Sequence, residues 1–336
     1  MINVAMIGFG GIAQSHKNAH LKFEAAGREK LVAVCDITPE QFTKRIKINL
    51  ETGKETLGGD FKTYTNLEEM LSNEKIDLID ICIPSYLHAD MAVAMLERGY
   101  NVLSEKPMAL CSEDCRRIID ARNKSGKQLM IGQCLRFYGE YQYLKKIVSE
   151  ETYGKVTSVL FQRLSALPKW SWNNWYQDFS KSGSVICDMQ IHDLDMARYL
   201  FGEPEYVECR ASTKNVKYDL AHVNLGYDFP LTSIGDWTLN GTKFTQMYRV
   251  GFEKANVVME NGKITVYPND CSAPYEPEWT KVGGIEAEID YYLDIIESGK
   301  QNQKNPAESA AETIRLVEAA YESADNGGIR IPFKNK

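Results

Sequence analysis

The sequence predicts two domains of the α/β class: a doubly wound parallel sheet, then an α+β domain with an open, mostly antiparallel sheet. In the first part of the 336-residue chain, continuous apolar runs alternate with helix-like segments, as in parallel sheets buried on both faces. Beyond about residue 150, runs with alternating or β-branched residues predominate. The length also exceeds what a single small core requires.

Five short apolar runs predict the strands of the first domain: residues 3–8, 31–36, 76–84, 101–104 and 128–132. Four helix-like segments lie among them: residues 11–26, 67–72, 85–99 and 112–126. Asn66 and Ser85 stand where an N-cap is expected, and Gly99 and Gly126 stand where a helix ends. This alternation predicts a parallel sheet with helices between its strands.

The second domain begins with a predicted strand over 156–165 and a tryptophan-rich loop. A helix over 183–200 follows, and then four to six strand-like runs lie between 205 and 266, with Asn-Gly turns at 240–241 and 261–262. Two helices close the chain: one has an apolar face, and the other opens with Asn-Pro-Ala-Glu at 305–308. We predict domains over 1–125 and 126–336, with the closing helix 306–324 packed back on the first domain.

The composition is that of a globular protein, with 43% hydrophobic and 25% charged residues. Acidic residues outnumber basic residues by 46 to 39, and no basic run stands out, which disfavours nucleic acid and anionic membranes as partners. No stretch approaches the roughly 18 apolar residues of a membrane span. The first residues lack a basic leader, so we expect a cytoplasmic protein. The eight cysteines are scattered without a Cys-x-x-Cys pair, which is typical of reduced core residues.

A glycine-rich turn follows the first predicted strand. Gly8, Gly10 and Ala13 match the pattern G-x-G-x-x-[GA], with Gly11 and Ile12 inside it. The motif ends a strand and opens a helix, which is the context in which it binds a dinucleotide. One glycine makes the turn, the second lets the backbone approach pyrophosphate, and the helix N-terminus faces the phosphates. The sequence therefore predicts a dinucleotide-binding Rossmann domain; a glycine turn without a ligand is the alternative.

Asp36 ends the second predicted strand, 26 residues after Gly10. A carboxylate at this place accepts hydrogen bonds from the ribose hydroxyls of the adenosine and repels a 2′-phosphate. Ile37 and Thr38 supply no cation that would compensate. The predicted cofactor is therefore NAD rather than NADP. The alternative is an aspartate that only caps a loop.

Four motifs, including the glycine-rich turn, resemble those of a known family. Ser104-Glu105-Lys106-Pro107 follows a predicted strand and resembles the E-K-P signature of the glucose–fructose oxidoreductase / inositol dehydrogenase / MocA family. The resemblance extends to GFGGIAQSH (8–16), CIPSYLHADMA (82–92) and SGSVICDMQIHDLDMARYLFGEP (182–204), in the expected order. It covers essentially the whole chain and implies a Rossmann domain followed by an α+β domain.

The resemblance implies three catalytic residues. Lys106 matches the lysine that positions and polarises the reacting hydroxyl, and Asp188 and His192 match a D-x-x-x-H pair whose histidine accepts the proton. The chemistry agrees, because alcohol oxidation releases a proton and imidazole titrates near neutral pH. On a continuous helix, Asp188 and His192 would share a face. The spacing also suits a metal site, but the sequence offers no third ligand, so we expect no metal.

The family resemblance also implies neighbours of the cofactor. The segment with Pro84, Ser85 and His88 borders it, and Glu105 and Lys106 lie in the signature beside it. Two alternatives stay open: Ser85 as an N-cap only, and His88 as a partner of backbone groups only.

Substrate contacts are predicted after the first domain. Gln133 and Arg136 follow its last strand and are candidates for the cleft. Trp175 lies in the tryptophan-rich loop and either stacks on a sugar ring or packs in a core or an interface. The family often has arginine after this tryptophan, and NADP-using members rely on it; here Tyr176 follows, which weakens the case for NADP.

These observations predict a reversible hydride transfer between NAD and a hydroxyl of a small-molecule polyol, sugar or glycoside, as in inositol 2-dehydrogenases or sugar dehydrogenases. One alternative is a reductase of another carbonyl or imine substrate on the same scaffold. Another is a dinucleotide-binding regulator without turnover. The resemblance favours a homodimer or homotetramer.

Overall fold

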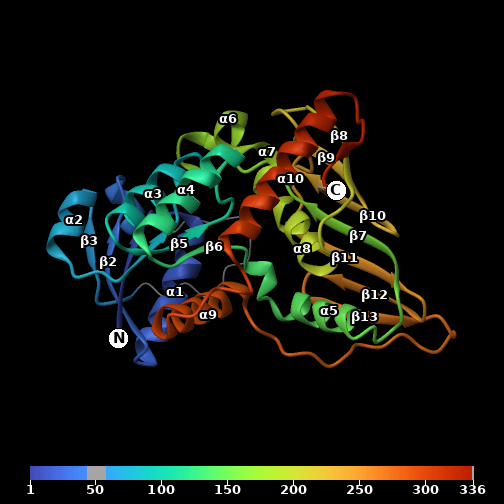
Figure 1. Ribbon diagram of the computed structural model, residues 1–336, viewed down its shortest axis with the longest axis horizontal. Helices are drawn as coiled ribbons and strands as arrows, with labels where there is room; N and C mark the ends of the chain where they lie inside the picture. The colour runs from blue at the N-terminus through green and yellow to red at the C-terminus, as the bar shows by residue number, and fades with distance from the viewer. Residues whose placement is uncertain (44–57, 335–336) are drawn as a thin grey trace. The chain divides into compact units, whose positions relative to one another are not determined.

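The computed structural model describes residues 1–43 and 58–334 (Figure 1). Contacts divide the chain into two compact units. The first unit comprises Met1–Cys134 and Gly284–Ala311, and the second comprises Leu135–Gly283 and Glu312–Lys336. The predicted boundary at residue 125 lies earlier, because the strand at 129–132 still belongs to the first sheet.

The first unit contains a six-stranded parallel sheet in the order β3-β2-β1-β4-β5-β6. Its strands are β1 (Ile2–Ile7), β2 (Glu29–Cys35), β3 (Lys62–Tyr64), β4 (Leu78–Ile81), β5 (Asn101–Glu105) and β6 (Leu129–Gly132). The strand β3 is not predicted from the sequence, because its three residues Lys-Thr-Tyr form no apolar run and have no fully buried side chain. The strand order reverses direction between β1 and β4, and a doubly wound sheet binds its ligand at that point.

Among residues 1–43, 58–134 and 284–311, five helices belong wholly to the first unit: α1 (Gly11–Ala25), α2 (Leu67–Asn73), α3 (His88–Glu97), α4 (Ser112–Ser125) and α9 (Gly284–Ser298). The helix α3 packs against α4, and α9 lies against α1 (Figure 1). The last pairing explains why a segment so late in the chain belongs to this unit. There, Arg28 pairs with Asp290 and Asp294 of α9.

The predicted helix caps of the first unit are only partly correct. Asn66 caps α2 as expected, since its side chain accepts a hydrogen bond from the backbone N–H of Glu69. Ser85 does not cap a helix: it begins a 3₁₀ turn, η2 (Ser85–Leu87), and α3 starts only at His88. Gly126 ends α4 in the left-handed conformation, as predicted.

The second unit contains an eight-stranded sheet in the order β13-β12-β11-β7-β10-β9-β8-β14. Its strands are β7 (Val156–Leu164), β8 (Tyr206–Ser212), β9 (Leu220–Gly226), β10 (Pro230–Asp236), β11 (Thr245–Phe252), β12 (Ala255–Glu260), β13 (Lys263–Pro268) and β14 (Ile331–Pro332). Only the β7–β10 pair is parallel; the other pairs are antiparallel. The predicted hairpin at Asn261-Gly262 joins β12 to β13, with positive φ angles at both residues.

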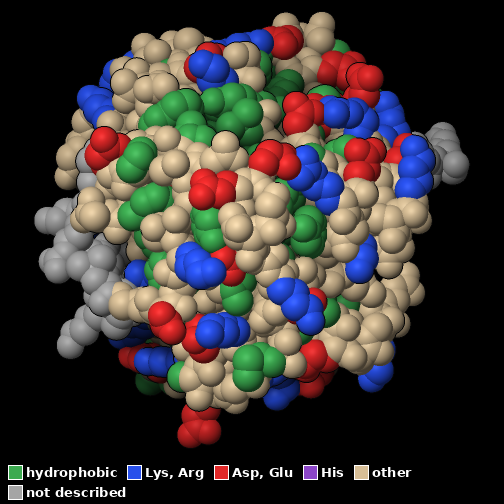
Figure 2. Space-filling view, turned by 90° about the vertical axis from the view of Figure 1, so that its left-hand side faces the viewer, with side chains coloured by type: hydrophobic (Ala, Val, Ile, Leu, Met, Phe, Trp, Pro, Cys, Tyr) green, Lys and Arg blue, Asp and Glu red, His purple; other side chains and the backbone are tan. Residues whose placement is uncertain are grey.

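The helices of the second unit are α5 (Gly139–Ser149), α6 (Phe179–Ser182), α7 (Ser184–Asp188), α8 (Ile191–Phe201) and most of α10 (Ala307–Asp325). The helix α7 packs on β9 and β10, and α8 on α5. The described part of the chain contains no helix that is both long and apolar enough to cross a membrane. Figure 2 shows acidic and basic side chains interspersed over one face of the molecule.

The predicted helix over 183–200 is wrong in one respect: the structure splits it into α7 and α8. At the break, the backbone N–H groups of Met189 and Gln190 both donate to the carbonyl oxygen of Val185. The Gln190 side chain is fully buried and donates to the Ser233 carbonyl at 2.8 Å. Asp188 and His192 therefore lie on two successive helices rather than one face of a continuous helix.

Candidate functional site

The glycine turn connects β1 to α1 within the first unit. Gly8 has a φ angle of +90°, and its backbone N–H donates to the Cys35 carbonyl at 2.8 Å. A Cβ atom on Gly8 would lie 2.4 Å from the carbonyl oxygen of Cys82. Only glycine fits this position, because both the backbone angle and the packing exclude a side chain. The turn is thus held against the ends of β2 and β4.

Gly10 is the N-cap residue of α1, and Gly11 is the first helical residue. A Cβ atom on Gly10 would meet no atom of the chain within 4 Å, so the space in front of it is open. Glycine has no capping side chain, so N–H groups of the first helical turn stay available to a ligand. Ala13 is fully buried, as the third small residue of the motif should be. These features fit a pyrophosphate.

Asp36 follows β2 and is half-buried. Its Oδ2 atom accepts a hydrogen bond from the Phe9 backbone N–H at 2.8 Å, and its Oδ1 atom accepts one from Thr38 N–H at 2.8 Å. The carboxylate is therefore fixed beside the glycine turn. Each carboxylate oxygen can accept a second hydrogen bond, so ribose hydroxyls can still be bound there.

Lys106 follows β5 directly, at the same carboxyl edge of the sheet as the glycine turn. The Glu105 carboxylate accepts the Lys106 backbone N–H at 3.0 Å through Oε2, and Glu105 itself is only 6% exposed. Lys106 is half-buried, and the Lys106–Pro107 peptide bond is cis. Glu105 thus holds the backbone of the lysine, which differs from the direct contact with cofactor that the resemblance implies.

His88 is 1% exposed and bridges two backbone segments. Its Nδ1 atom lies 2.7 Å from the Pro107 carbonyl oxygen, and its Nε2 atom lies 2.8 Å from that of Ile83. Burial is the main reason why the pKa of His88 is lowered. The structure thus favours the alternative in which His88 binds only backbone groups. It braces the segment after Lys106, and both of its ring nitrogens are occupied by backbone carbonyls.

Three other predicted residues follow strands at the carboxyl edge of the parallel sheet in the first unit. Pro84 precedes the turn η2, and the Ser85 side chain is 4% exposed. Gln133 follows β6 and is 1% exposed, and both atoms of its amide have no hydrogen-bond partner among residues 1–43 and 58–334. A buried amide without partners is costly, so a bound molecule that pairs with Gln133 would remove this cost.

In the second unit, Asp188 ends α7 and His192 lies in the first turn of α8. Asp188 is 8% exposed, while His192 is half-buried. Upstream, Gly183 and Ser184 both have positive φ angles, and a Cβ atom on Gly183 would lie 2.5 Å from Cys187. The Ser-Gly-Ser sequence thus forms a tight turn that starts the helix ending at Asp188.

Arg136 is buried in an ion pair rather than placed in a cleft. Its Nε and Nη2 atoms lie 2.8 and 2.7 Å from the two carboxylate oxygens of Asp195, and both residues are almost fully buried. Thr313 donates to the same carboxylate at 3.0 Å. Two donors of Arg136 are thus committed to Asp195, which corrects the expectation that this side chain faces a substrate.

Asp193 has a different partner from its neighbour Asp195. Its Oδ1 atom accepts a hydrogen bond from Arg163 at 2.9 Å, and both side chains are buried. Burial raises the pKa of Asp193 to about 6, although the charge of Arg163 opposes the shift. The two aspartates of the stretch 192–195 therefore anchor α8 to its surroundings.

Trp175 is 8% exposed and stacks on Tyr176 with 3.9 Å between ring centroids. Tyr176 also packs edge-on against Trp170 and Trp237. These contacts favour the core-packing alternative for Trp175 over a sugar-stacking surface.

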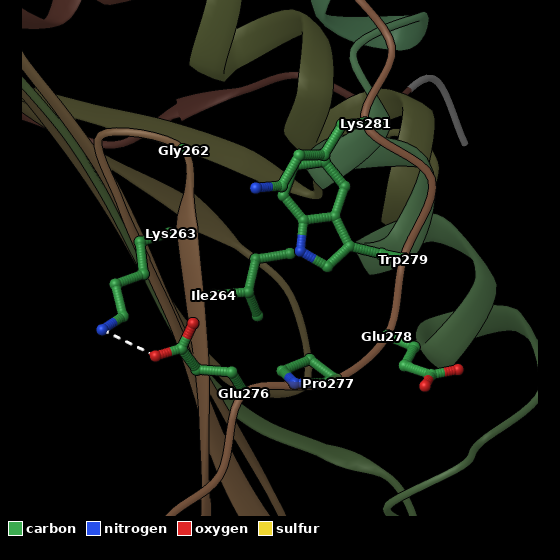
Figure 3. Close-up of a pocket in the computed structure, with 8 residues that line it drawn as sticks. All are labelled: Gly262, Lys263, Ile264, Glu276, Pro277, Glu278, Trp279 and Lys281. Carbon is green, nitrogen blue, oxygen red and sulfur yellow. Dashed lines mark ion pairs between the residues drawn. The ribbon is translucent and has the colours of Figure 1, made fainter.

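A hollow in the second unit lies beside β13 and the segment that precedes α9 (Figure 3). The Trp279 ring faces it, and Lys263 pairs with Glu276 at 2.7 Å on its rim. None of the site residues predicted from the sequence lines this hollow.

The first unit also contains a cluster of buried ionisable groups that was not predicted from the sequence. His16 and His20 lie on α1, and both bind Asp80 of β4. Two sets of groups there are close enough to hold a metal ion, His16 with Asp80 and Cys82, and His16 with Glu105 and Glu288. The only sign in the sequence is the spacing of His16 and His20, which places both on one helix face.

Two models of protein-family domains match the chain, one in each of the two units. Residues 2–133 match the oxidoreductase family with an NAD-binding Rossmann fold, and residues 141–265 match the GFO/IDH/MocA C-terminal domain. Both matches are to domains of one family of oxidoreductases, and the first of them is its NAD-binding Rossmann domain. The chain belongs to the GFO/IDH/MocA family.

The relatives differ in what they catalyse. D-apiose dehydrogenase of Paraburkholderia graminis is 23% identical over 96% of this chain and 88% of that enzyme. Inositol 2-dehydrogenase of Salmonella paratyphi B is 26% identical over 60% of this chain and 55% of that enzyme. The 2,7-anhydro-N-acetylneuraminate hydratase of Escherichia coli is 29% identical over 43% of this chain, and the match spans only 38% of the hydratase.

One solved structure extends the comparison to the whole fold. Levoglucosan dehydrogenase in complex with NADH and levoglucosan has a TM-score of 0.82 and 18% identity, covering 99% of this chain and 100% of that one. This similarity confirms the predicted two-part fold.

Proposed function

We propose that this protein is an NAD-dependent dehydrogenase that oxidises a hydroxyl of a polyol, sugar or glycoside. Bound NAD would supply the C4 atom of nicotinamide as hydride acceptor. Lys106 would anchor the hydroxyl, His192 would take its proton, and Asp188 would orient the imidazole. The named dehydrogenases among the relatives support this class of substrate.

The observation that carries the proposal is the position of Lys106. Doubly wound sheets bind a dinucleotide across the strand-order reversal, here between β1 and β4. Asp36 marks the adenosine side, after β2, and Lys106 follows β5 on the opposite side. A lysine there would stand near the nicotinamide half. Its backbone N–H is held by the Glu105 carboxylate, so the lysine side chain starts from a fixed point at the carboxyl edge of the sheet.

Cofactor preference follows from Asp36. Its carboxylate is fixed beside the glycine turn, where it would favour the 2′-hydroxyl of NAD and repel the 2′-phosphate of NADP. We propose NAD as the preferred cofactor on this ground.

The experiment is an absorbance assay of NADH formation with a panel of inositols, free sugars and glycosides. We expect wild-type protein to reduce NAD with at least one member. Lys106→Ala and His192→Asn should each lower kcat by about 10²–10⁴-fold. Lys124→Ala, at an exposed lysine of α4, is the matched control and should retain full activity.

Two outcomes would favour the alternatives. Turnover of carbonyl or imine substrates with NADH, without oxidation of any hydroxyl, would indicate a reductase. Tight NAD binding without turnover in either direction would indicate a regulator. A dehydrogenase whose cofactor never dissociates would also fail to reduce added NAD. Chromatography of the dinucleotide released from the denatured protein identifies this case, because the purified protein would then already contain bound dinucleotide.

A further inference from the structure

Five buried side chains of the first unit form a continuous chain in which carboxylates and imidazoles alternate. It runs from Glu29 through His20, Asp80 and His16 to Glu105, with successive distances of 2.8, 2.9, 2.8 and 2.9 Å. Glu105 is 6% exposed, and the other four residues are completely buried. We call this set the carboxylate–imidazole chain.

Both imidazoles of the chain are cationic. A carboxylate can only accept hydrogen bonds, so each ring nitrogen that faces one must carry a proton. His16 and His20 each have carboxylates at both nitrogens. Burial alone would lower the pKa of His20, but Glu29 and Asp80 outweigh it and raise the pKa to about 9. The pKa of His16 is likewise raised well above its usual value, mainly by Asp80 against burial.

His16 joins the two parts of the first unit that the proposed reaction needs. It lies on α1, whose first turn forms the predicted pyrophosphate site. Its Nε2 atom binds Oε1 of Glu105, and Oε2 of Glu105 accepts the backbone N–H of Lys106. One imidazolium thus connects the helix behind the glycine turn to the backbone of the predicted catalytic lysine.

We propose that His16 is a positioning residue: through Glu105 it fixes the backbone of Lys106 relative to the pyrophosphate-binding end of α1. The inference rests on the proposed function for the role of Lys106. Without the imidazolium, Glu105 loses a charged hydrogen-bond donor and its carboxylate is free to leave the Lys106 N–H. An error of about 1 Å in a positioned group costs about a hundredfold in rate.

Glu288 of α9 completes the surroundings of His16. It is fully buried, and its two carboxylate oxygens have no hydrogen-bond partner in the described part of the chain. Burial and the charge of Glu105 raise the pKa of Glu288 well above its usual value, which favours the protonated form of its carboxyl group. A metal ion held by His16, Glu105 and Glu288 would need an unprotonated Nε2 atom, and the contact of Nε2 with Glu105 argues against one.

His20 provides a matched control for His16. It lies one turn further along the same helix, is equally buried, and is also bound by carboxylates at both nitrogens, but it does not contact Glu105. A loss of packing or charge balance should therefore affect His16→Gln and His20→Gln alike. Only His16→Gln should affect Lys106.

The experiment compares these two variants for melting temperature, NAD affinity by calorimetry, and kcat/KM. We expect similar losses of stability. We also expect His16→Gln to lower kcat/KM by about tenfold to a hundredfold at equal folded fraction, and to weaken NAD binding more than His20→Gln does. Equal effects of the two variants on NAD affinity and on kcat/KM would overturn the proposal. So would stoichiometric divalent metal in the purified protein that is lost in Glu288→Gln.

Glu105→Gln provides a second variant: it completes a double-mutant cycle where His16→Gln folds, and it is measured alone where His16→Gln does not fold. Glu105→Gln keeps the size of the side chain and removes the charge that binds His16. If both act on Lys106 through one path, the effects of His16→Gln and Glu105→Gln on kcat/KM are not additive; additive effects contradict the proposal. If His16→Gln cannot be purified, a Glu105→Gln variant with wild-type kcat/KM and NAD affinity contradicts it as well. NAD affinity needs no substrate, so it tests the link to α1 even if the proposed dehydrogenase activity fails.

Discussion

The Oδ2 atom of Asp36 accepts a hydrogen bond from the backbone N–H of Phe9, with 2.8 Å between the two atoms. This contact joins the end of β2 to the glycine turn, 27 residues earlier in the chain. It fixes the carboxylate that we propose to select between the two forms of the dinucleotide.

Replacement of Asp36 by serine should weaken the preference for NAD over NADP. The 2′-phosphate would no longer meet a negative charge, and the ribose hydroxyls would lose a charged acceptor worth about 1.5–3 kcal/mol. We expect the ratio of kcat/KM for NAD to that for NADP to fall by about tenfold to a hundredfold. Asp60→Ser, at an exposed aspartate, is the control. An unchanged ratio in Asp36→Ser would show that another residue sets the preference.

Two glycines of the same turn should respond differently to alanine. Gly8→Ala forces a side chain into a backbone with φ of +90° and against the Cys82 carbonyl, so the free energy of unfolding should fall by at least roughly 1–3 kcal/mol. Gly10→Ala meets no atom of the chain and needs no unusual φ angle. We expect Gly10→Ala to keep its stability in urea denaturation but to lose NAD affinity in calorimetry. Equal NAD affinity in Gly10→Ala and wild type would contradict a pyrophosphate at this turn.

Arg136 should prove structural. Arg136→Met leaves the Asp195 carboxylate buried without its cationic partner, which costs about 3–5 kcal/mol. The double variant Arg136→Met/Asp195→Leu removes both charges and should recover part of that stability. Thermal denaturation measures these effects. A rise in KM for Arg136→Met without a loss of stability would instead restore the prediction from sequence that Arg136 contacts the substrate.

The carboxylate–imidazole chain should make stability depend on pH in the alkaline range. The folded protein holds the His20 proton with a pKa of about 9, compared with 6.5 for an ordinary histidine. This stabilisation is fully present below about pH 6.5 and is lost as the pH rises towards about 9. We expect the free energy of unfolding to fall over this range, and to fall less steeply in His20→Gln. Urea denaturation at several pH values is the measurement, and identical slopes in both proteins would count against a protonated His20.

The sequence predicts well those features that depend on local patterns. The alternation of apolar runs and helices indicates the parallel sheet. The glycine turn lies between β1 of that sheet and α1, as expected. The hairpin at Asn261-Gly262 is also confirmed, because its conformation depends on two adjacent residues. The strand β3 was missed because it is short and polar.

Features that depend on distant partners were not predictable. His16 and Glu105 are separated by 89 residues, and Arg136 and Asp195 by 59, so no local pattern links them. The break between α7 and α8 depends on Gln190, whose amide is buried against Ser233 of β10. In the sequence, Gln190 is an ordinary helix former.

The most direct test of the proposed hydride transfer uses a polyol or sugar that carries deuterium on the carbon of the reacting hydroxyl. Mass spectrometry of the nicotinamide product measures where the deuterium goes. The proposal predicts that each molecule of reduced NAD contains one transferred deuterium. It also predicts that Lys106→Ala and His192→Asn form almost no reduced NAD in the same time. Reduced NAD without deuterium, or wild-type rates in both variants, would contradict it.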